Sequence, residues 1–452
     1  STLMHVCGII AEYNPFHSGH AYQIAQARAD SGCDYLIVIM SGDFVQRGAP
    51  AITDKYIRAR MALEAGAVLV LMMPVYASTA SAEGFARAGV ATLHTTGVAD
   101  AISFGCENPA ICGKPYRDLA HMLSAEPAEF RAVLQSGLSS GLSYAQARSR
   151  AIHHCCADTC DPALLDHPNN LLAFEYMRAI EYTHANLRLY PVRRLGSYHD
   201  SAGATADPDC TGITDSPGSI GTAASPGSSS DIQEFLSASA CRSMLIDEPE
   251  TALHTLYAQA QMPGRSIALL RQYEDAYAFL SENDLTAQLH YALLTQQRRG
   301  YASYLDCATD LSARILRSLG AYDHFSTFCD LLKNKSLTRA RIARVLTHIL
   351  LQLPAQPATP LIDGSGYVPY LRVLGFRSSA ADLLHRIKQQ SHAPLITRPA
   401  QIHEPAQTAS DQDAMQEYFS QDLLASDVYR SALLHKCGRC YADDYRRRIE
   451  IV

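Results

Sequence analysis

The residues best suited to chemistry are two histidines, His17 and His20, in the passage GIIAEYNPFHSGH at residues 8–20. Its apolar first half is typical of a strand, Asn14-Pro15 is a turn signal, and Gly19 opens a helical segment. Histidines three positions apart at a helix start lie on one side, beside unpaired backbone N–H groups and the positive end of the dipole. This arrangement favours binding of a triphosphate, and Gly19 lets a nucleotide approach the backbone. The alternative is a pair of surface histidines beside a helix cap.

A second polar passage, SGDFVQRGAPAITDK at residues 41–55, directly follows an apolar run at residues 35–40. In a parallel sheet flanked by helices, ligands bind at the carboxyl ends of the strands. The passage is therefore expected to lie beside the histidines, unless it is an ordinary solvated loop. Its candidate residues for contact with a substrate or a phosphate are Asp43, Gln46, Arg47 and Lys55.

The elements that must position these residues alternate between strands and helices. Apolar runs typical of strands lie at residues 5–12, 35–40, 69–73 and 101–104. The clearest helix between them has Thr53 as its N-cap and stops at Gly66. This alternation predicts an α/β fold with a doubly wound parallel sheet. Residues 116–184 are expected to be mainly helical, and residues 187–195 to form one further strand.

The second half of the chain is expected to be mainly helical. Periodic apolar residues predict helices at residues 311–317, 339–353 and 380–388, after a helix that begins near Ser239. A short apolar run at residues 393–397 predicts a lone strand between helices.

One segment has the composition of an insertion. Residues 201–230 are rich in Gly, Ser, Thr, Pro and Asp, which predicts an exposed, mobile segment without catalytic groups. With 452 residues the chain can bury more than one core. We therefore expect a catalytic α/β domain over residues 1–250 and a mainly helical domain over residues 251–452.

Composition restricts the function classes. The longest apolar stretch, residues 67–77, is far shorter than the roughly 20 residues of a membrane-spanning helix. No secretory signal pattern precedes the first strand, so a cytoplasmic location is expected. The formal charge of −7 is not typical of a nucleic-acid binder, so any RNA partner would have to meet a local basic patch.

The 13 cysteines do not predict a disulfide framework, because their number is odd and their spacing irregular. Two passages invite a zinc interpretation, residues 153–160 with HHCC and Cys160, and residues 435–440 with His435, Cys437 and Cys440. Each lacks the four ligands at recognisable spacing that a structural zinc site needs. Reduced, partly buried thiols are expected instead, with no structural zinc and no metal bound by the chain's own residues.

The two N-terminal passages together resemble the bacterial tRNA(Met) cytidine acetate ligase family, within the nucleotidyltransferase superfamily that carries an HxGH motif. Further passages with family counterparts are SFGCE at 103–107, HPNNLLAFEY at 167–176, RRLGSYHD at 193–200, SASACR at 237–242, TRARIARVLTHILLQL from 338 and VPYLRVLGF from 368. The resemblance implies a HIGH-type, Rossmann-like catalytic domain. It also implies activation of acetate with ATP to acetyl-adenylate, followed by acetyl transfer to N4 of the wobble cytidine of elongator tRNA(Met).

The resemblance assigns catalytic roles to His17, His20 and Arg242. The residues that it places at ATP are Ile10, Ala11, Glu12, Tyr13, Asn14, Pro15, Phe16, His17, Ser18, Gly19, His20, Ala21, Tyr22, Gln23, Gly105, Asn169, Asn170, Arg194 and Leu195. Ser237 and Ser239 precede Arg242 in a serine-rich turn that suits a triphosphate; the alternative is an ordinary N-cap beside a solvated arginine. Ionised acetate needs no general base, so positioning and charge neutralisation suffice, with Mg²⁺ expected to bridge the phosphates.

Two basic clusters are candidates for tRNA contact. One consists of Lys333, Lys335, Arg339, Arg341 and Arg344, with His348 beside them. Arg341, Arg344 and His348 recur at three- and four-residue steps and therefore lie along one helix face. The other is Arg446 to Arg448, next to Tyr445. Each of them could equally be a solvated charged face.

The chain departs from the family pattern at the third strand. Members are expected to have Glu-Leu-Pro where this chain has Met72-Met73-Pro74, and an Asp where it has Val68. Two other functions therefore stay open. One is a nucleotidyltransferase or acid-activating ligase with another acceptor, such as a cofactor precursor or a protein thiol. The other is a non-catalytic tRNA- or nucleotide-binding protein.

Overall fold

A computed structural model of the chain describes residues 4–142, 144–156, 159–195, 235–406 and 408–452. The expected insertion at residues 201–230 lies outside these ranges, as does the end of the RRLGSYHD passage from residue 196 onward. No helix of the described residues is long and apolar enough to cross a membrane.

Five parallel strands form the centre of the molecule, as predicted. They are β1 (Val6–Ala11), β2 (Tyr35–Ser41), β5 (Leu69–Met73), β6 (Ala101–Cys106) and β7 (Arg188–Arg193), in the spatial order β5-β2-β1-β6-β7. The four strands other than β7 are almost wholly buried because both faces of the sheet are covered, which explains their continuous apolar sequences.

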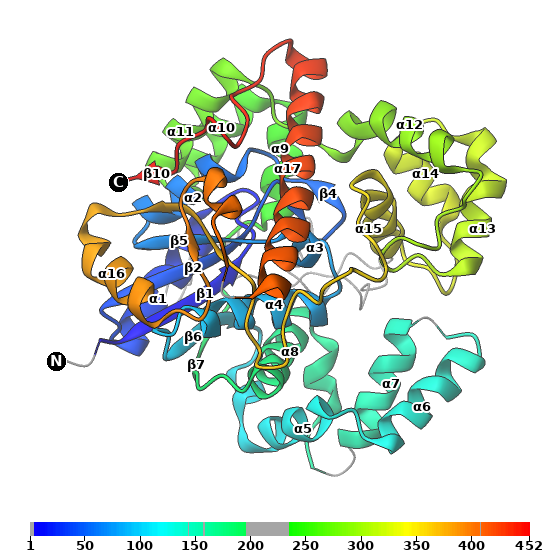
Figure 1. Ribbon diagram of the computed structural model, residues 1–452, viewed down its shortest axis with the longest axis horizontal. Helices are drawn as coiled ribbons and strands as arrows, with labels where there is room; N and C mark the ends of the chain where they lie inside the picture. The colour runs from blue at the N-terminus through cyan, green and yellow to red at the C-terminus, as the bar shows by residue number, and fades with distance from the viewer. Residues whose placement is uncertain (1–3, 143, 157–158, 196–234, 407) are drawn as a thin grey trace, which may run out of the picture.

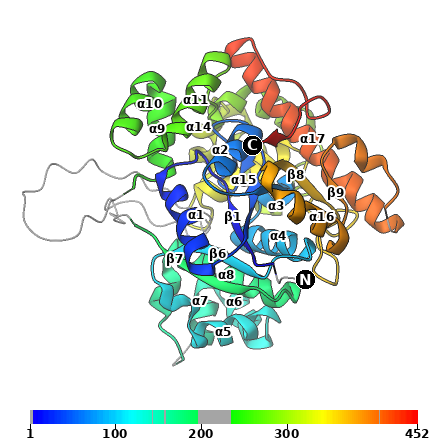
Figure 2. The ribbon, with the colours of Figure 1, turned by 90° about the vertical axis from the view of Figure 1, so that its left-hand side faces the viewer.

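Helices cover both faces of this sheet (Figures 1 and 2). One face is packed against α1 (Ser18–Ser31), α2 (Lys55–Glu64), α9 (Ala238–Asp247), α10 (Pro249–Ala258) and α11 (Gly264–Ala276). The other is packed against α4 (Ala82–Thr95) and α8 (Pro168–Thr183), and beyond them lie α5 (Lys114–Ser124), α6 (Ala128–Ser139) and α7 (Tyr144–Cys156). The predicted doubly wound α/β architecture is confirmed.

The N-cap of α2 differs from the expected one. Asp54, not Thr53, caps this helix, because its Oδ1 accepts the backbone N–H groups of Tyr56 at 2.7 Å and Ile57 at 3.2 Å. An ionised carboxylate is also the better partner for the positive end of the helix.

The order of the strands creates a topological switch point at one edge of the sheet. From β1 the chain proceeds to β2 and β5 on one side, and later to β6 and β7 on the other. The loops that follow β1 and β6 therefore run to opposite faces and separate at the carboxyl ends of these strands. Such a switch point is where ligands bind in open α/β sheets.

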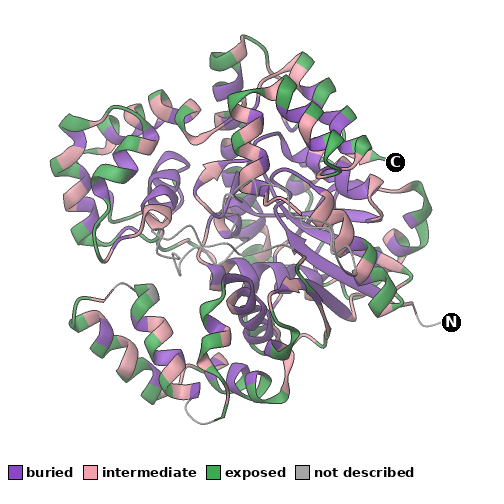
Figure 3. Ribbon diagram, turned by 180° about the vertical axis from the view of Figure 1, so that it is seen from behind, coloured by how far each residue is buried: buried purple, intermediate pink, exposed green. Residues whose placement is uncertain are grey.

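The predicted helices of the second half form a lobe with its own apolar core. The lobe consists of α12 (Thr286–Gln296), α13 (Thr309–Ser318), α14 (Phe325–Leu332) and α15 (Arg339–Leu350), and the end of the long α17 (Ala409–Cys437) packs against it. Figure 1 shows the lobe beside the sheet, and Figure 3 shows that α15 is its most buried helix.

The chain then returns to the sheet. β8 (Leu371–Phe376) pairs antiparallel with β5, and both β9 (Leu395–Ile396) and β10 (Glu450–Ile451) pair with β8. The strand predicted between helices at residues 393–397 is present as β9, and it satisfies its backbone groups by pairing with β8. α16 (Ala381–Gln390) connects β8 to β9. The division at residue 250 stays a prediction, and the sheet takes strands from both sides of it.

Candidate active site

The two histidines lie together at the first turn of α1. His17 is the N-cap, and its Nδ1 accepts the backbone N–H of Gly19 at 3.0 Å. The Nδ1 of His20 accepts the backbone N–H of His17 at 3.3 Å, and the two rings stack with centroids 3.8 Å apart. The expected juxtaposition of the imidazoles is thus present, at the switch point between β1 and β6.

Burial lowers the pKa of His20 well below its ordinary value, and the nearby His17 and Arg194 lower it further. The ring is therefore neutral at physiological pH. Because Nδ1 accepts a hydrogen bond, the proton of the neutral ring is on Nε2. Tyr13 and Phe16 support the ring, with centroids 4.9 Å and 5.6 Å away. A neutral N–H donor in a fixed orientation can bind a phosphate oxygen without an ion pair.

The turn between β1 and α1 is fixed from two sides. The Asn14 side chain accepts the backbone N–H of Ile52 at 2.8 Å, which connects the turn to the second polar passage. The Asn14 carbonyl accepts a hydrogen bond from Arg242 Nη1 at 2.6 Å, which connects it to α9. Tyr13 takes a left-handed conformation, with φ of 52°, and the Asn14-Pro15 peptide bond is cis. The histidines are therefore carried by a loop with defined neighbours.

Arg58 supports the same edge of the sheet and was missed by the sequence analysis. Its guanidinium is fully buried and donates to the backbone carbonyls of Glu12 at 2.5 Å, Ser41 at 3.2 Å and Thr53 at 3.2 Å, and to that of Gly42. The group thus connects the carboxyl ends of β1 and β2. The sequence carries no signal for this role, because the position of an arginine along a helix does not show whether its side chain is buried or solvated.

The second polar passage splits between two environments. Lys55 Nζ lies 2.6 Å from Asp43 Oδ2, 3.0 Å from Asp444 Oδ1 and 3.2 Å from Ser426 Oγ, and all these groups are buried. Asp444 also binds Arg372 at 2.5 Å. Asp43 and Lys55 are therefore brought together, but as part of an ion network with the C-terminal segment.

Gln46 and Arg47 lie in the hairpin formed by β3 (Phe44–Val45) and β4 (Ala49–Pro50). The Gln46 backbone N–H donates to Glu12 Oε1 at 2.8 Å. Arg47 Nη1 donates to Ser239 Oγ at 3.2 Å, so this hairpin reaches the start of α9.

The N-terminus of α9 is the second place that suits an anion. Ser237 caps the helix by accepting the backbone N–H of Ala240 at 3.2 Å. Ser239 Oγ accepts from Arg47 and also from Arg242, both at 3.2 Å. Two guanidinium groups from distant segments thus meet at a helix N-terminus, where their charge and the dipole favour phosphate. The alternative of a solvated Arg242 does not hold, because its guanidinium is bound to Asn14 and Ser239.

A third part of the candidate site follows β6. The Glu107 carboxylate accepts the backbone N–H groups of Asn169 at 3.2 Å and Asn170 at 2.8 Å, at the start of α8. The side chain of Asn169 also binds Glu107 at 2.6 Å and accepts from Arg194 at 2.8 Å. A Cβ at Gly105 would lie 3.4 Å from the Arg194 side chain. Glu107 was not predicted, although a carboxylate directly after a strand was an available signal.

The similarity of the chain to known proteins agrees with this geometry. Residues 4–211 and 222–443 match the family model described as HIGH Nucleotidyl Transferase. A tRNA(Met) cytidine acetate ligase of Thermoanaerobacter sp. (strain X514) is 30% identical over 95% of this chain and 96% of its own length. That of Bacillus velezensis (strain DSM 23117 / BGSC 10A6 / LMG 26770 / FZB42) is 31% identical over 94% and 92%.

The chain belongs to the tRNA(Met) cytidine acetate ligase family. It is therefore an enzyme of the ligase class. A crystal structure of Thermotoga maritima TmcAL bound with alpha-thio ATP superimposes with a TM-score of 0.83, covers 99% of both chains and is 24% identical. That structure shares the fold of this chain.

The two positions at which the sequence differs from the expected family pattern lie in the core. Val68 and Met72 are both buried in β5 and its approach, and Met72 is the cross-strand partner of Arg372 in β8. A family carboxylate at position 72 would lie beside this arginine. Here Asp444 supplies the carboxylate for Arg372 from the C-terminal segment, so the cation is not left without a counter-ion.

The first basic cluster is only partly at the surface, which corrects the expectation. Arg344 is 2% exposed and His348 fully buried, with the His348 Nδ1 and Nε2 atoms each 2.8 Å from a backbone carbonyl. The predicted spacing along α15 is present, but Arg344 lies beside Gly48 of the β3–β4 hairpin, and the two carbonyls that His348 contacts belong to Leu305 and Thr79. Residues that keep some exposure are Lys333, Lys335, Arg339 and Arg341. Of these, Arg339 pairs with Glu282 and Asp330, and Lys333 pairs with Asp330 at 3.2 Å.

The second basic cluster is also divided. Arg446 and Arg448 are exposed, as is Tyr445. The Arg447 guanidinium instead lies over the rings of Tyr56 at 4.8 Å and Tyr441 at 4.6 Å. Its role is to hold the C-terminal segment on α2.

The thiols differ from expectation at one place. Cys156 and Cys160 form a disulfide, so the prediction of reduced thiols is wrong for this pair. Cys437 and Cys440 are free thiols. The described part of the chain contains no group of three or more His, Cys, Asp or Glu that could hold a metal ion.

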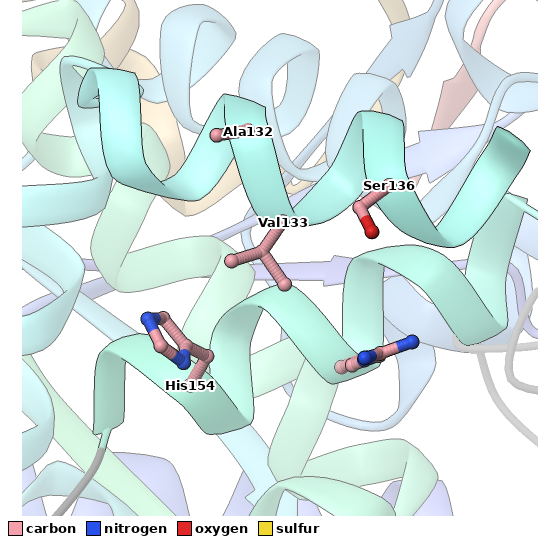
Figure 4. Close-up of a pocket in the computed structure, with 5 residues that line it drawn as sticks. Ala132, Val133, Ser136 and His154 are labelled. Atoms are coloured by element: carbon pink, nitrogen blue, oxygen red, sulfur yellow. The ribbon is translucent and has the colours of Figure 1, made fainter.

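An open depression of about 520 Å³ lies between α6 and α7 (Figure 4). Its lining residues are Ala132, Val133, Ser136, Arg150 and His154. Figure 4 shows Ala132, Val133 and Ser136 on one helix and His154 on the other, and none of them belongs to the three parts of the candidate site.

Proposed function

We propose that the protein activates acetate with ATP to acetyl-adenylate and transfers the acetyl group to N4 of the wobble cytidine of elongator tRNA(Met), in the cytoplasm. The observation that carries this proposal is the stacked pair His17 and His20 at the start of α1, in a chain that matches the ligase family over 95% of its length. The structure of the relative from Thermotoga maritima holds an ATP analogue, which supports ATP as the nucleotide.

The first step needs charge neutralisation more than acid or base groups. The carboxylate of acetate forms a bond to the α-phosphorus, and pyrophosphate leaves with the electron pair of the broken P–O bond. His20 donates through Nε2, and Arg242 and Arg47 supply positive charge from the start of α9. These groups are fixed before the reaction, so they stabilise the developing charge without reorganisation.

The adenosine is assigned to the third part of the site. Asn170 is fully buried, and its Nδ2 has no hydrogen-bond partner within the described ranges, so it can donate to the nucleotide. Glu107 and Arg194 hold the neighbouring Asn169 in place. The chain offers no cluster of ligands for Mg²⁺ among its described residues, so this ion would be bound through the phosphates of ATP.

The exposed part of the first basic cluster is proposed to contact tRNA. Lys333 and Lys335 project from the segment that precedes α15, and Arg341 lies in the first turn of α15. Cations at such positions neutralise phosphates of the RNA backbone, while a single-stranded anticodon base is recognised at the reacting site.

The test is incubation of the protein with ATP, Mg²⁺, labelled acetate and unmodified elongator tRNA(Met), followed by nucleoside analysis. We expect N4-acetylcytidine that requires ATP, and none in a control tRNA whose wobble cytidine is replaced by uridine. Acetyl-adenylate without label in RNA would instead support another acceptor, such as a cofactor precursor or a protein thiol. Binding of tRNA without either product would support a non-catalytic protein.

A further inference from the structure

Gln46 carries a buried side-chain amide in the β3–β4 hairpin. Its side chain is 2% exposed, and neither Nε2 nor Oε1 has a hydrogen-bond partner among the residues that the structure describes. Buried polar groups are nearly always hydrogen-bonded, because an unpaired group loses water without compensation. The unpaired amide therefore indicates a ligand that offers a hydrogen-bond acceptor and a donor side by side.

The backbone that carries this amide is fixed. The Gln46 N–H binds the Glu12 carboxylate at 2.8 Å, and the Thr347 hydroxyl binds the Gly48 carbonyl at 2.8 Å. Gly48 has a φ of 72°, and a Cβ there would overlap the backbone of Ala343 in α15. With the hairpin seated on α15, the backbone of Gln46 is held in place before a ligand binds.

The same hairpin faces the reacting part of the proposed site. Glu12 directly follows β1 and precedes the loop that carries His17. Arg47, the next residue after Gln46, donates to Ser239 at the start of α9, where Arg242 also donates. Gln46 thus lies between the carboxyl end of β1 and the start of α9, which are the two places assigned to phosphates.

We propose that Gln46 is a catalytic residue of the acetyl-transfer step, an inference that rests on the proposed function. In this step N4 of cytidine bonds to the carbonyl carbon of acetyl-adenylate, and the carbonyl π electrons move to oxygen. The tetrahedral carbon then carries an oxyanion beside a positively charged N–H. Nε2 donates to the oxyanion, and Oε1 accepts from N4. The carbonyl re-forms, AMP leaves with the electron pair of the broken C–O bond, and N4 loses one proton to water.

The adenine edge could pair with both halves of an amide, but the adenosine is assigned to the start of α8, so the ligands left for Gln46 are acetate, the phosphates and the reacting cytidine. Acetate and the phosphates of ATP offer acceptors alone, so Oε1 would stay buried without a partner. The tetrahedral species presents an oxygen and an N–H on one carbon, which matches the adjacent nitrogen and oxygen of an amide. Gln46 is therefore complementary to a state between substrate and product, the condition for rate acceleration.

The experiment separates the two half-reactions. Acetate-dependent exchange of pyrophosphate into ATP measures adenylate formation without RNA. Single-turnover transfer from enzyme-bound acetyl-adenylate to elongator tRNA(Met) measures the second step. Gln46→Met removes both amide groups at similar volume, and Gln389→Met is the matched control at an exposed residue of α16. Thermal unfolding of each variant reports on the fold.

Loss of one donor to an oxyanion lowers kcat by about 100-fold to 1,000-fold, so transfer by Gln46→Met should fall by about 100-fold or more and exchange by less than about tenfold. Gln46→Glu keeps a hydrogen-bond acceptor, but its carboxylate repels the oxyanion, so the transfer rate should fall at least as much as in Gln46→Met. If Gln46→Met does not fold, the two half-reactions are compared in Gln46→Glu instead. Equal losses in both half-reactions, or transfer at the wild-type rate, would overturn the proposal. Wild-type protein that labels no cytidine would refute the proposed function instead.

Discussion

His20→Ala should remove most adenylate formation while leaving the fold intact. The neutral ring holds its proton on Nε2, because Nδ1 accepts the His17 N–H at 3.3 Å and burial lowers the pKa of His20. Alanine removes this donor from the phosphate. The loss of one preorganised donor lowers kcat by about 100-fold to 1,000-fold, or about 3–4 kcal/mol of transition-state stabilisation. The structural loss is one capping hydrogen bond, about 1 kcal/mol of folding free energy.

The assay is acetate-dependent exchange of pyrophosphate into ATP, together with urea unfolding of the same preparations. His20→Asn is the matched variant, since its amide can both accept the His17 N–H and donate, and it should retain more exchange than alanine. A neutral donor also predicts that wild-type exchange does not fall as the pH rises from about 6 to about 8. Equal turnover in His20→Ala and wild type would refute the assignment, and a fall with pH over that range would show that an imidazolium is needed.

Three further predictions concern groups around the site. Asp444→Asn leaves Lys55 and Arg372 buried with one carboxylate fewer, so the free energy of unfolding in urea should fall by about 3–5 kcal/mol; an unchanged value contradicts this. Glu107→Gln should raise the KM for ATP in the exchange assay more than it lowers kcat, because Glu107 orients the start of α8; a loss in kcat alone would exclude that role. Burial raises the pKa of Asp422 to about 6, so the folded protein binds this proton more tightly than the unfolded chain. Stability in urea should therefore fall as pH rises from about 4 to about 6, and Asp422→Asn should reduce that slope; an identical slope would contradict the assignment.

Local sequence determined the part of the site that a single passage builds. A strand, a turn and a helix start follow one another within residues 8–20, so the positions of His17 and His20 relative to each other depend on a few backbone angles. The same holds for Ser237 as the N-cap of α9. Four of the five central strands, β1, β2, β5 and β6, were predictable because parallel strands that are buried on both faces consist of unbroken apolar runs.

Spacing along a helix did not determine which face is covered. Arg341, Arg344 and His348 do follow one another along α15, but Arg344 is buried beside Gly48 of the β3–β4 hairpin, and His348 is buried against the carbonyls of Leu305 and Thr79. Arg58 is the converse case, since a charged residue of α2 became the buried centre of four backbone carbonyls. Periodicity gives an angle around the helix axis, whereas burial depends on the element that packs there.

The sequence by itself therefore determined the motif, the alternation of strands and helices in the first half, and the family resemblance. Only the tertiary structure decided which distant residues meet. β8, β9 and β10 join a sheet whose other strands lie more than 170 residues earlier, and Asp444 reaches Lys55 from the C-terminal segment. Arg47 and Arg242 likewise meet at Ser239 from opposite ends of the catalytic half. Such contacts depend on how whole elements pack, which no local pattern encodes.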